Sequence, residues 1–354
     1  MRQTPLYDEH VSLGGKVVDF HGWALPVQFS GIVMEHLHTR TKAALFDCSH
    51  MGEFRIHGQD AVRAYSRLVC SDPERLPVGR GRYGAVLNDE GGIIDDVITI
   101  RLAEDEWYAV TNAGPLEKVS PLFRGAHSGI EDVSDTTAKI DIQGPSAREV
   151  LVREIPEAAN LKYFNARPAR WKNIDIILSR TGYTGELGYE LFVPEACAPA
   201  LWRALLEHAE VEPAGLGARD TLRTEVGYLL SGQDFDESRT PLEANMESFV
   251  AWDTDFTGKE ALLEQRSRGG YAVMTAIRTE DRRAPRHDFD VKLNGAVVGC
   301  VTSGTYGPSV GHGIGLAYVP QDLATPGHAL TAGPKELPIE TTSLPFYTAG
   351  TCRK

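Results

Sequence analysis

Two adjacent aspartates, Asp95 and Asp96, lie inside a stretch that otherwise has the composition of a buried β-strand. Successive side chains of a strand point to opposite faces, so Asp96 falls among aliphatic residues. These neighbours are Ile94, Ile98, Ile100 and Leu102. An unpaired carboxylate on an apolar face costs on the order of several kcal/mol unless a partner or a ligand compensates it. Asp96 is therefore the first candidate for a functional group, whereas Asp95 is expected on a face that stays wet.

A second candidate group is a pair of arginines in a predicted helix. Arg219, Leu222, Arg223 and Val226 follow the i, i+3, i+4, i+7 spacing of one helical stripe, so one or both guanidinium groups are expected to be buried. Two interpretations stay open. The arginines form a structural salt bridge with a carboxylate such as Glu190, or they provide a fork for a ligand carboxylate or heterocycle.

A glycine-rich hairpin is predicted by the stretch SRTGYTGELGYELFV. It places Tyr183 at one end and Glu190 on the return strand. A tyrosine in such a position is more often a core residue than a ligand platform, so the pattern alone does not assign a role to Tyr183.

Several kinds of chemistry find no support in the sequence. The five cysteines contain no C-x-x-C pair, which argues against a disulfide framework or a zinc site, and we expect them to be reduced. His36 and His38 are two residues apart and point to different sides of a helix, so metal catalysis is not expected. No G-x-S-x-G elbow is present, and neither GLGARD nor GPSVGHGIG completes a nucleotide-binding loop.

Composition narrows the choice of partner. The 354 residues carry 36 Lys and Arg against 49 Asp and Glu, a formal net charge of −13. This balance argues against nucleic acid or an anionic membrane as the main partner. The first residues lack a signal-peptide pattern and no run approaches 18 apolar residues, so we expect a cytoplasmic protein.

The elements that must position these groups alternate irregularly, which favours an α+β fold. Helices are predicted over 34–46, with Met34 and Leu37 on the buried side, and over 60–69, 199–211 and 217–230. Strands are predicted over 52–58, 91–102, 106–112, 138–144, 175–180 and 189–193. From about residue 270 the composition changes to short strands between Gly- and Pro-rich turns, typical of a small β-barrel. We place a boundary there, between a region 1–266 and a barrel domain 270–350.

The chain resembles a known family in nine blocks that occur in the family's order and spacing. They include FHGWALPVQFSGIVMEH, LPVGRGRYGAVLNDEGGIIDDV, SRTGYTGELGYELFV, LLSGQDFDESRTPLEA and VTSGTYGPSVGHGIGLAYV. The sequence is similar to the glycine cleavage system T-proteins, which are aminomethyltransferases. The resemblance implies a three-domain cloverleaf around a tetrahydrofolate pocket, with two interleaved N-terminal α+β domains and a C-terminal β-barrel. It also implies a lipoylated H-protein as partner.

The resemblance assigns roles to particular residues. The second aspartate of GGIIDD, here Asp96, faces the folate in this family and stabilises the cationic methylene during transfer from the S-aminomethyl lipoyl arm. The other matched positions are implied to contact the folate. They are Met51, Tyr83, Asn112, Tyr183, Glu190, Arg219 and, in a more divergent context, Arg286.

Two departures and three alternatives remain. The segment 245–256 differs from the family pattern, and the tail TAGTCRK lacks the tyrosine with which some members reach the folate. One alternative is a folate-dependent demethylase of the same superfamily with another donor. A second is a folate-binding protein without turnover, although the cysteine signature of those relatives is absent. The third is a purely structural ion pair between Asp96 and Arg219.

Overall fold

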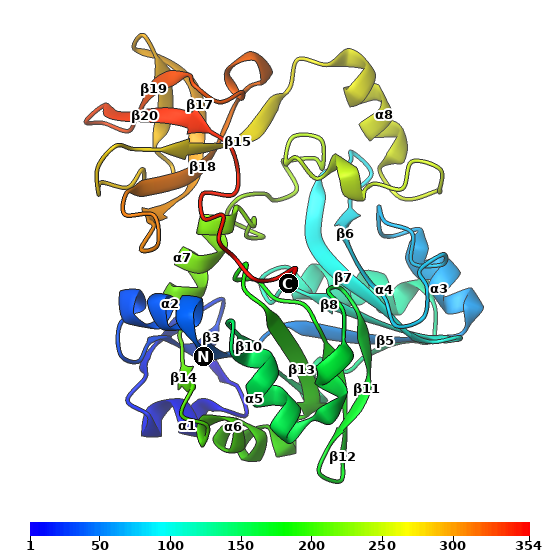
Figure 1. Cartoon of the computed structure of the whole chain (residues 1–354). Coiled ribbons are helices and arrows are strands. Elements are labelled where there is room, and N and C mark those ends of the chain that lie inside the picture. The colour runs from blue at the N-terminus through cyan, green and yellow to red at the C-terminus, as the bar shows by residue number, and fades with distance from the viewer.

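The computed structural model describes residues 1–354 and has three lobes (Figure 1). Two lobes are built on open sheets, and the third is a closed six-stranded barrel at the C-terminal end. The predicted α+β class and C-terminal barrel are thereby confirmed.

The first lobe contains a five-stranded antiparallel sheet in the order β6-β7-β8-β5-β9. Its strands are β5 Gly52–His57, β6 Gly81–Leu87, β7 Ile93–Ala103, β8 Glu106–Thr111 and β9 Ile130–Asp132. Helices α3 (Gln59–Ser66) and α4 (Leu116–Ala126) cover one face of the sheet. Alternation along β5 explains the arrangement, because Phe54 and Ile56 enter the core under these helices while Glu53 points to the opposite face.

The second lobe contains a six-stranded sheet in the order β11-β12-β13-β10-β4-β14. Its strands are β4 Ala43–Asp47, β10 Thr137–Gln143, β11 Ala166–Trp171, β12 Ile174–Ser179, β13 Gly188–Pro194 and β14 Val211–Pro213. Helices α5 (Ala147–Glu154) and α6 (Ala198–Leu206) pack on one face over the largest core of the molecule. That core takes the residues at alternate positions of β10, namely Ala138, Ile140 and Ile142.

The two sheet lobes are interleaved along the chain. Strand β4 belongs to the six-stranded sheet, and only the residues 48–51 separate it from β5 of the five-stranded sheet. The chain completes the five-stranded sheet and then returns through β10, which pairs with β4 in antiparallel register. This short connection brings the helix-free faces of the two sheets against each other.

A small N-terminal sheet in the order β1-β3-β2 flanks the second lobe. Its strands are β1 Arg2–Gln3, β2 Lys16–Phe20 and β3 Trp23–Gln28, and the helices beside it are α1 Tyr7–Ser12, α2 Ile32–Thr41 and α7 Leu216–Val226. Five short 3-10 helices complete the connections: η1 Ser134–Thr136, η2 Pro156–Asn160, η3 Glu195–Cys197, η4 Glu247–Phe249 and η5 Gln321–Leu323.

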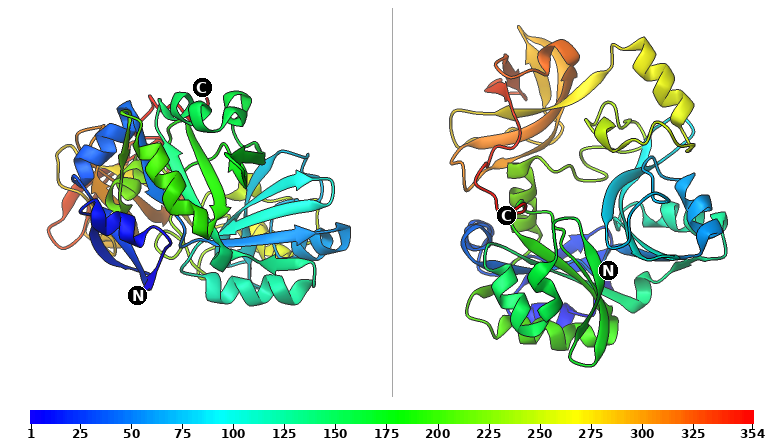
Figure 2. Two further views of the ribbon diagram at one scale, coloured as in Figure 1. Left: turned by 90° about the horizontal axis from the view of Figure 1, so that it is seen from below. Right: turned by 45° about the vertical axis from the view of Figure 1, so that its right-hand side comes forward.

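The barrel follows α8 (Lys259–Arg268) and closes in the order β15-β18-β17-β16-β19-β20. Its strands are β15 Ala272–Arg278, β16 Asp290–Leu293, β17 Ala296–Tyr306, β18 Gly313–Pro320, β19 Ala329–Ala332 and β20 Leu337–Thr342. The C-terminal tail, red in Figure 2, leaves the barrel and returns to the second lobe, where the Cys352 amide donates to the Gly185 carbonyl. The exact boundary at 266–270 stays a prediction.

The expectation that Asp95 lies on a wet face is wrong. Asp95 is fully buried, and the residues that share its face are Val97, in the core under α3 and α4, and Thr99, hydrogen-bonded to Tyr65 of α3. Alternation correctly separated the two aspartates. It did not reveal which face the helices cover, because both faces of this sheet are packed against other elements.

The helix predicted over 34–46 is wrong in its extent and in its buried face. Helix α2 ends at Thr41 and strand β4 begins at Ala43. Met34 is 65% exposed, whereas the buried side of α2 carries Glu35, His36 and Arg40. The hydrophobic pattern fails here because Arg40 makes buried ion pairs, and their carboxylate partners come from distant parts of the sequence.

Candidate functional site

The candidate site lies where the helix-free faces of the two sheets meet. An interface core joins residues of both sheets, among them Ile100, Tyr108 and Val110 of the first and Ile177 and Phe192 of the second. Charged side chains occupy the same faces at positions set by strand alternation. They form two clusters, one on each sheet.

The first cluster is centred on Asp96 of β7, which is half-buried. Asn112, which directly follows β8, donates through Nδ2 to Asp96 Oδ1 at 2.6 Å. The Tyr83 side chain of β6 also interacts with this carboxylate and lowers its pKa. The same Asn112 side chain also donates to Asp95 Oδ1 at 2.8 Å, so one amide links the two aspartates.

The pKa values of Asp95 and Asp96 are both raised, for partly different reasons. Burial raises the pKa of Asp96, and the interactions with Tyr83 and Asn112 partly oppose this shift. Burial and the negative charge of Asp96 raise the pKa of Asp95. Two carboxyl groups this close titrate as a pair, so the pair takes up a first proton at a higher pH than an ordinary carboxylate would. Of the two aspartates, only Asp96 is partly exposed and can be contacted by a ligand.

The second cluster lies on the facing sheet and on α7. Arg219 donates through Nη1 to Asp141 Oδ2 of β10 at 2.9 Å, and Lys139 Nζ of the same strand is 2.7 Å from Asp141 Oδ1. Lys139 is also 3.4 Å from Oε1 of Glu190 on β13, which is the strand neighbour of Asp141. Four charges of alternating sign therefore form one connected group.

Tyr183 and Met51 are the remaining predicted residues of the two sheet lobes. The Arg219 guanidinium lies over the Tyr183 ring, 5.0 Å from its centroid. Burial raises the pKa of Tyr183, and the charge of Asp96 raises it further while Arg219 opposes. Met51 precedes β5. It packs against the core between the two sheets and against a second core that includes residues of β4 and α7. Seven of the eight predicted site residues thus belong to the two sheet lobes or to α7 beside them.

Arg286 is the exception among the predicted residues. It lies in the loop between β15 and β16 of the barrel, is exposed, and its side chain makes no ion pair or hydrogen bond. The structure does not join it to either cluster, and its contact with a ligand stays a prediction.

The sequence analysis missed Lys139 and Asp141. The available signal was the same alternation that singled out Asp96, because in AKIDIQ the apolar residues Ala138, Ile140 and Ile142 alternate with polar ones. One of the two interpretations left open for the helical arginines was a salt bridge to a carboxylate such as Glu190. Arg219 instead pairs with Asp141, and Arg223 pairs with Asp234 at 2.5 Å.

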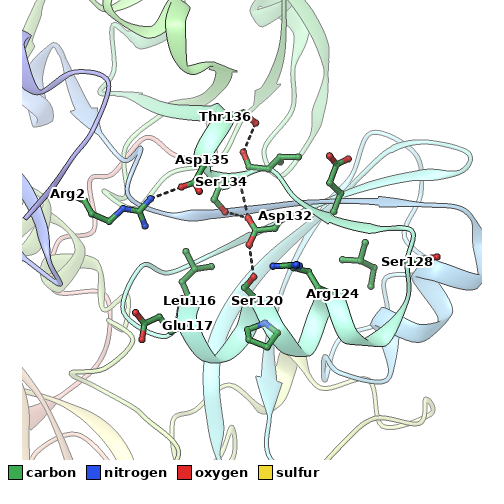
Figure 3. Close-up of a pocket in the computed structure, with 14 residues that line it drawn as sticks. Arg2, Leu116, Glu117, Ser120, Arg124, Ser128, Asp132, Ser134, Asp135 and Thr136 are labelled. Carbon is green, nitrogen blue, oxygen red and sulfur yellow. Dashed lines mark hydrogen bonds and ion pairs between the residues drawn. The ribbon is translucent and has the colours of Figure 1, made fainter.

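An open depression of about 780 Å³ lies elsewhere, on the outer side of the first lobe (Figure 3). It is lined by α4 and the segment from β9 to η1, where Ser120 donates to Asp132 at 2.6 Å. None of the predicted site residues lines it. Arg2 pairs with Asp135, and the Asp132 carboxylate accepts from the hydroxyls of Ser120 and Ser134. These carboxylates already have partners, so we do not assign the functional site to this depression.

The structure contains neither a metal-binding cluster nor a membrane-spanning helix. No group of three or more His, Cys, Asp or Glu side chains is arranged to hold a metal ion. None of the helices combines the length and the apolar character required to cross a bilayer.

These features define a class: an α+β protein with a charged site between two facing sheets and an appended closed barrel. The chain matches the GCVT N-terminal domain family over residues 6–254 and the glycine cleavage T-protein C-terminal barrel domain over residues 273–348.

Individual relatives match this chain over nearly its full length. An aminomethyltransferase of Halothermothrix orenii is 39% identical over 356 residues, which cover 98% of this chain and 100% of that protein. An aminomethyltransferase of Saccharopolyspora erythraea is 40% identical, with 98% of each chain covered. The crystal structure of glycine cleavage system aminomethyltransferase T from Bartonella henselae superposes with a TM-score of 0.92 at 32% identity, covering 99% of both chains. The chain belongs to the glycine cleavage T-protein family and is an aminomethyltransferase.

Proposed function

We propose that the enzyme transfers the methylene of an S-aminomethyl group, carried on the lipoyl arm of an H-protein, to tetrahydrofolate. The carbon–nitrogen and carbon–sulfur bonds of the aminomethyl group break, and the methylene becomes bonded to N5 and N10 of tetrahydrofolate. The two protons displaced from these nitrogens leave with ammonia and with the thiol of the dihydrolipoyl arm. The products are 5,10-methylenetetrahydrofolate, ammonia and dihydrolipoyl H-protein.

The observation that carries this proposal is the Asp96 carboxylate between the sheets. It is half-buried, accepts a 2.6 Å hydrogen bond from Asn112, and has no cation paired with it. Positive charge develops on the methylene as the amine or thiol leaves, and a preorganised carboxylate stabilises that charge more than it stabilises a neutral ground state. Because burial raises its pKa, Asp96 is also suited to accept a proton from a folate nitrogen.

The second cluster fits the pterin end of a folate. The 2-aminopyrimidine part of a pterin presents adjacent N–H donors, which a carboxylate such as Glu190 can accept together. Arg219 and Tyr183 add a planar cation beside an aromatic ring, a surface suited to a heterocycle. Tetrahydrofolate would be held by these residues and supply the nucleophilic nitrogens, while Asp96 meets the reacting carbon.

The direct test is release of ammonia from aminomethylated H-protein. We expect release that depends on tetrahydrofolate and produces an equal amount of 5,10-methylenetetrahydrofolate. Release that does not require the folate, or transfer only from another donor such as dimethylsulfoniopropionate, would exclude the proposed reaction. The cytoplasmic location stays a prediction.

A further inference from the structure

The charged group on the second sheet is a linear chain of four side chains. It runs from Arg219 to Asp141, then to Lys139, then to Glu190, with N–O separations of 2.9, 2.7 and 3.4 Å. The signs alternate along the chain and its formal charge is zero. Asp141 and Glu190 are directly paired residues of neighbouring strands, so the sheet fixes the spacing of the two carboxylates.

Only the two ends of this chain are within reach of a ligand. The side chains of Arg219 and Glu190 are 15% and 7% exposed, whereas those of Lys139 and Asp141 are 1% and 0% exposed. The two inner residues therefore cannot contact a substrate. Any influence they have on a ligand must pass through the end residue that each one contacts.

The inner pair influences the ionisation of Glu190 at one end and the orientation of Arg219 at the other. Burial raises the pKa of Glu190, and Lys139 is the largest influence that lowers it again. Lys139 thus keeps Glu190 available as a carboxylate, with both oxygens as acceptors. At the other end, Asp141 holds the Arg219 guanidinium in the orientation that places it over the Tyr183 ring.

We propose that Lys139 and Asp141 are positioning residues for folate binding, and that Lys139 acts by keeping Glu190 ionised while Asp141 acts by orienting Arg219. The inference rests on the proposed function, because it takes Glu190 and Arg219 as the ligand contacts. A buried ion pair by itself gives little stability compared with well-packed apolar residues. The value of this pair therefore lies in the two side chains that it controls.

The test is a pH series of tetrahydrofolate binding by calorimetry on the full chain. In Lys139→Met, Glu190 loses its positive neighbour, so burial raises the pKa of this carboxyl group without the opposing influence of Lys139. We expect the Kd to rise at least about tenfold at pH 7 and to recover as the pH is raised to 9 and Glu190 ionises. Wild type and the conservative Lys139→Arg should remain flat across this range. Lys162→Met, at an exposed position after η2, is the surface control and should match wild type.

A double-mutant cycle separates this role from general destabilisation. If Lys139 acts through Glu190, adding Lys139→Met to Glu190→Gln should change the Kd less than twofold. Asp141→Asn should show no such pH dependence, because Glu190 loses a negative neighbour and stays ionised, while Arg219 loses the partner that orients it. This variant should bind more weakly with a flat pH profile, and it serves as the test if Lys139→Met does not fold.

The outcomes separate the two proposals. A wild-type protein that binds no tetrahydrofolate overturns the proposed function together with this inference. Wild-type binding combined with an unchanged Kd in Lys139→Met, or with losses that add fully in the cycle, overturns the inference alone.

Discussion

Asp96 differs from its neighbour Asp95 in its capacity to make further contacts. The Asp95 carboxylate already accepts three hydrogen bonds, each at 2.8 Å. The donors are the backbone N–H of Asn112, the Nδ2 group of Asn112 and the hydroxyl of Ser231. Asp96 shares the Asn112 side chain and remains half-buried on the face between the sheets. Asp95 therefore holds Asn112 in place, and Asp96 is the member of the pair that the proposed reaction can use.

Replacing Asp96 by asparagine removes the charge and keeps the shape. We expect Asp96→Asn to fold normally and to lower kcat by roughly 10²–10³-fold, the usual effect of losing one preorganised electrostatic group. The measurement is tetrahydrofolate-dependent ammonia release, with circular dichroism to monitor folding. Asp89→Asn, an exposed position before the same strand, is the matched control. Turnover of Asp96→Asn near the wild-type rate would show that the carboxylate is not used.

Glu53 is a buried carboxyl group without a partner. It is 0% exposed, and neither carboxyl oxygen has a hydrogen bond. Burial raises the pKa of Glu53 well above its ordinary value. Between the ordinary and the raised pKa, the folded state holds a proton that the unfolded state releases, so the free energy of unfolding falls as the pH rises through this window.

We expect Glu53→Gln to remove that dependence. The variant should be close to wild type at acidic pH and increasingly more stable than wild type as the pH rises, by at most about 1.4 kcal/mol for each pH unit in the window. Urea unfolding at a series of pH values measures it. Glu131→Gln, at an exposed position on β9, should follow the wild-type curve. A constant difference between Glu53→Gln and wild type at all pH values would contradict the argument.

At the scale of elements, α2 shows how buried charges join segments that are distant in the sequence. Arg40 lies near the end of α2 and contacts Glu186 at 3.0 Å and Glu225 of α7 at 2.9 Å. His36, one turn earlier, is 3.1 Å from the same Glu225. The C-terminal tail covers this group, with the Arg40 guanidinium 4.2 Å from the centroid of the Tyr347 ring.

Removing Arg40 should therefore destabilise the protein strongly. Arg40→Met leaves two carboxylates buried without their cation, and we expect a loss of about 3–5 kcal/mol in the free energy of unfolding. Denaturant titration measures it. Arg63→Met, which breaks an exposed pair with Asp60 on α3, should cost no more than about 0.5 kcal/mol. Equal effects of the two substitutions would contradict the assigned importance of burial.

At the scale of the whole molecule, Asp234 joins the barrel to the sheet lobes. Its carboxylate accepts from Arg223 of α7 at 2.5 Å and from the Thr302 hydroxyl of β17 at 2.6 Å. Arg223 in turn donates to Ser303 of the same barrel strand at 2.7 Å. This polar junction complements the return of the C-terminal tail and the contact of Ser309, whose backbone N–H donates to Glu225 of α7, so several contacts hold the barrel to the rest of the molecule.

We expect Asp234→Asn to loosen the barrel without unfolding it. The substitution weakens the charge-assisted bond to Arg223, so protease cleavage near residues 266–271 should become faster and thermal unfolding should separate into two transitions. Limited proteolysis and calorimetry test this. Asp322→Asn, at an exposed barrel position, is the control. A single transition with wild-type cleavage rates would show that other contacts hold the barrel.

The sequence by itself determined the class of the fold, most strands, the C-terminal barrel and the placement of Asp95 and Asp96 on opposite faces of their strand. These follow from local patterns, because side-chain alternation and turn composition are set within a few residues. It failed where a residue's environment comes from elsewhere in the chain. Neither the burial of Asp95 nor the polar buried side of α2 can be read from its own segment.

Only the tertiary structure decided which charges meet. Lys139 and Glu190 come together because β10 and β13 are strand neighbours, and Arg219 reaches Asp141 because α7 packs beside that sheet. A charge is tolerated in a protein interior only beside its partner, and the partner's identity depends on how separate elements pack. The sequence analysis therefore identified Arg219 and Glu190, the two ends of the charge chain. Only the folded structure identified Lys139 and Asp141 between them.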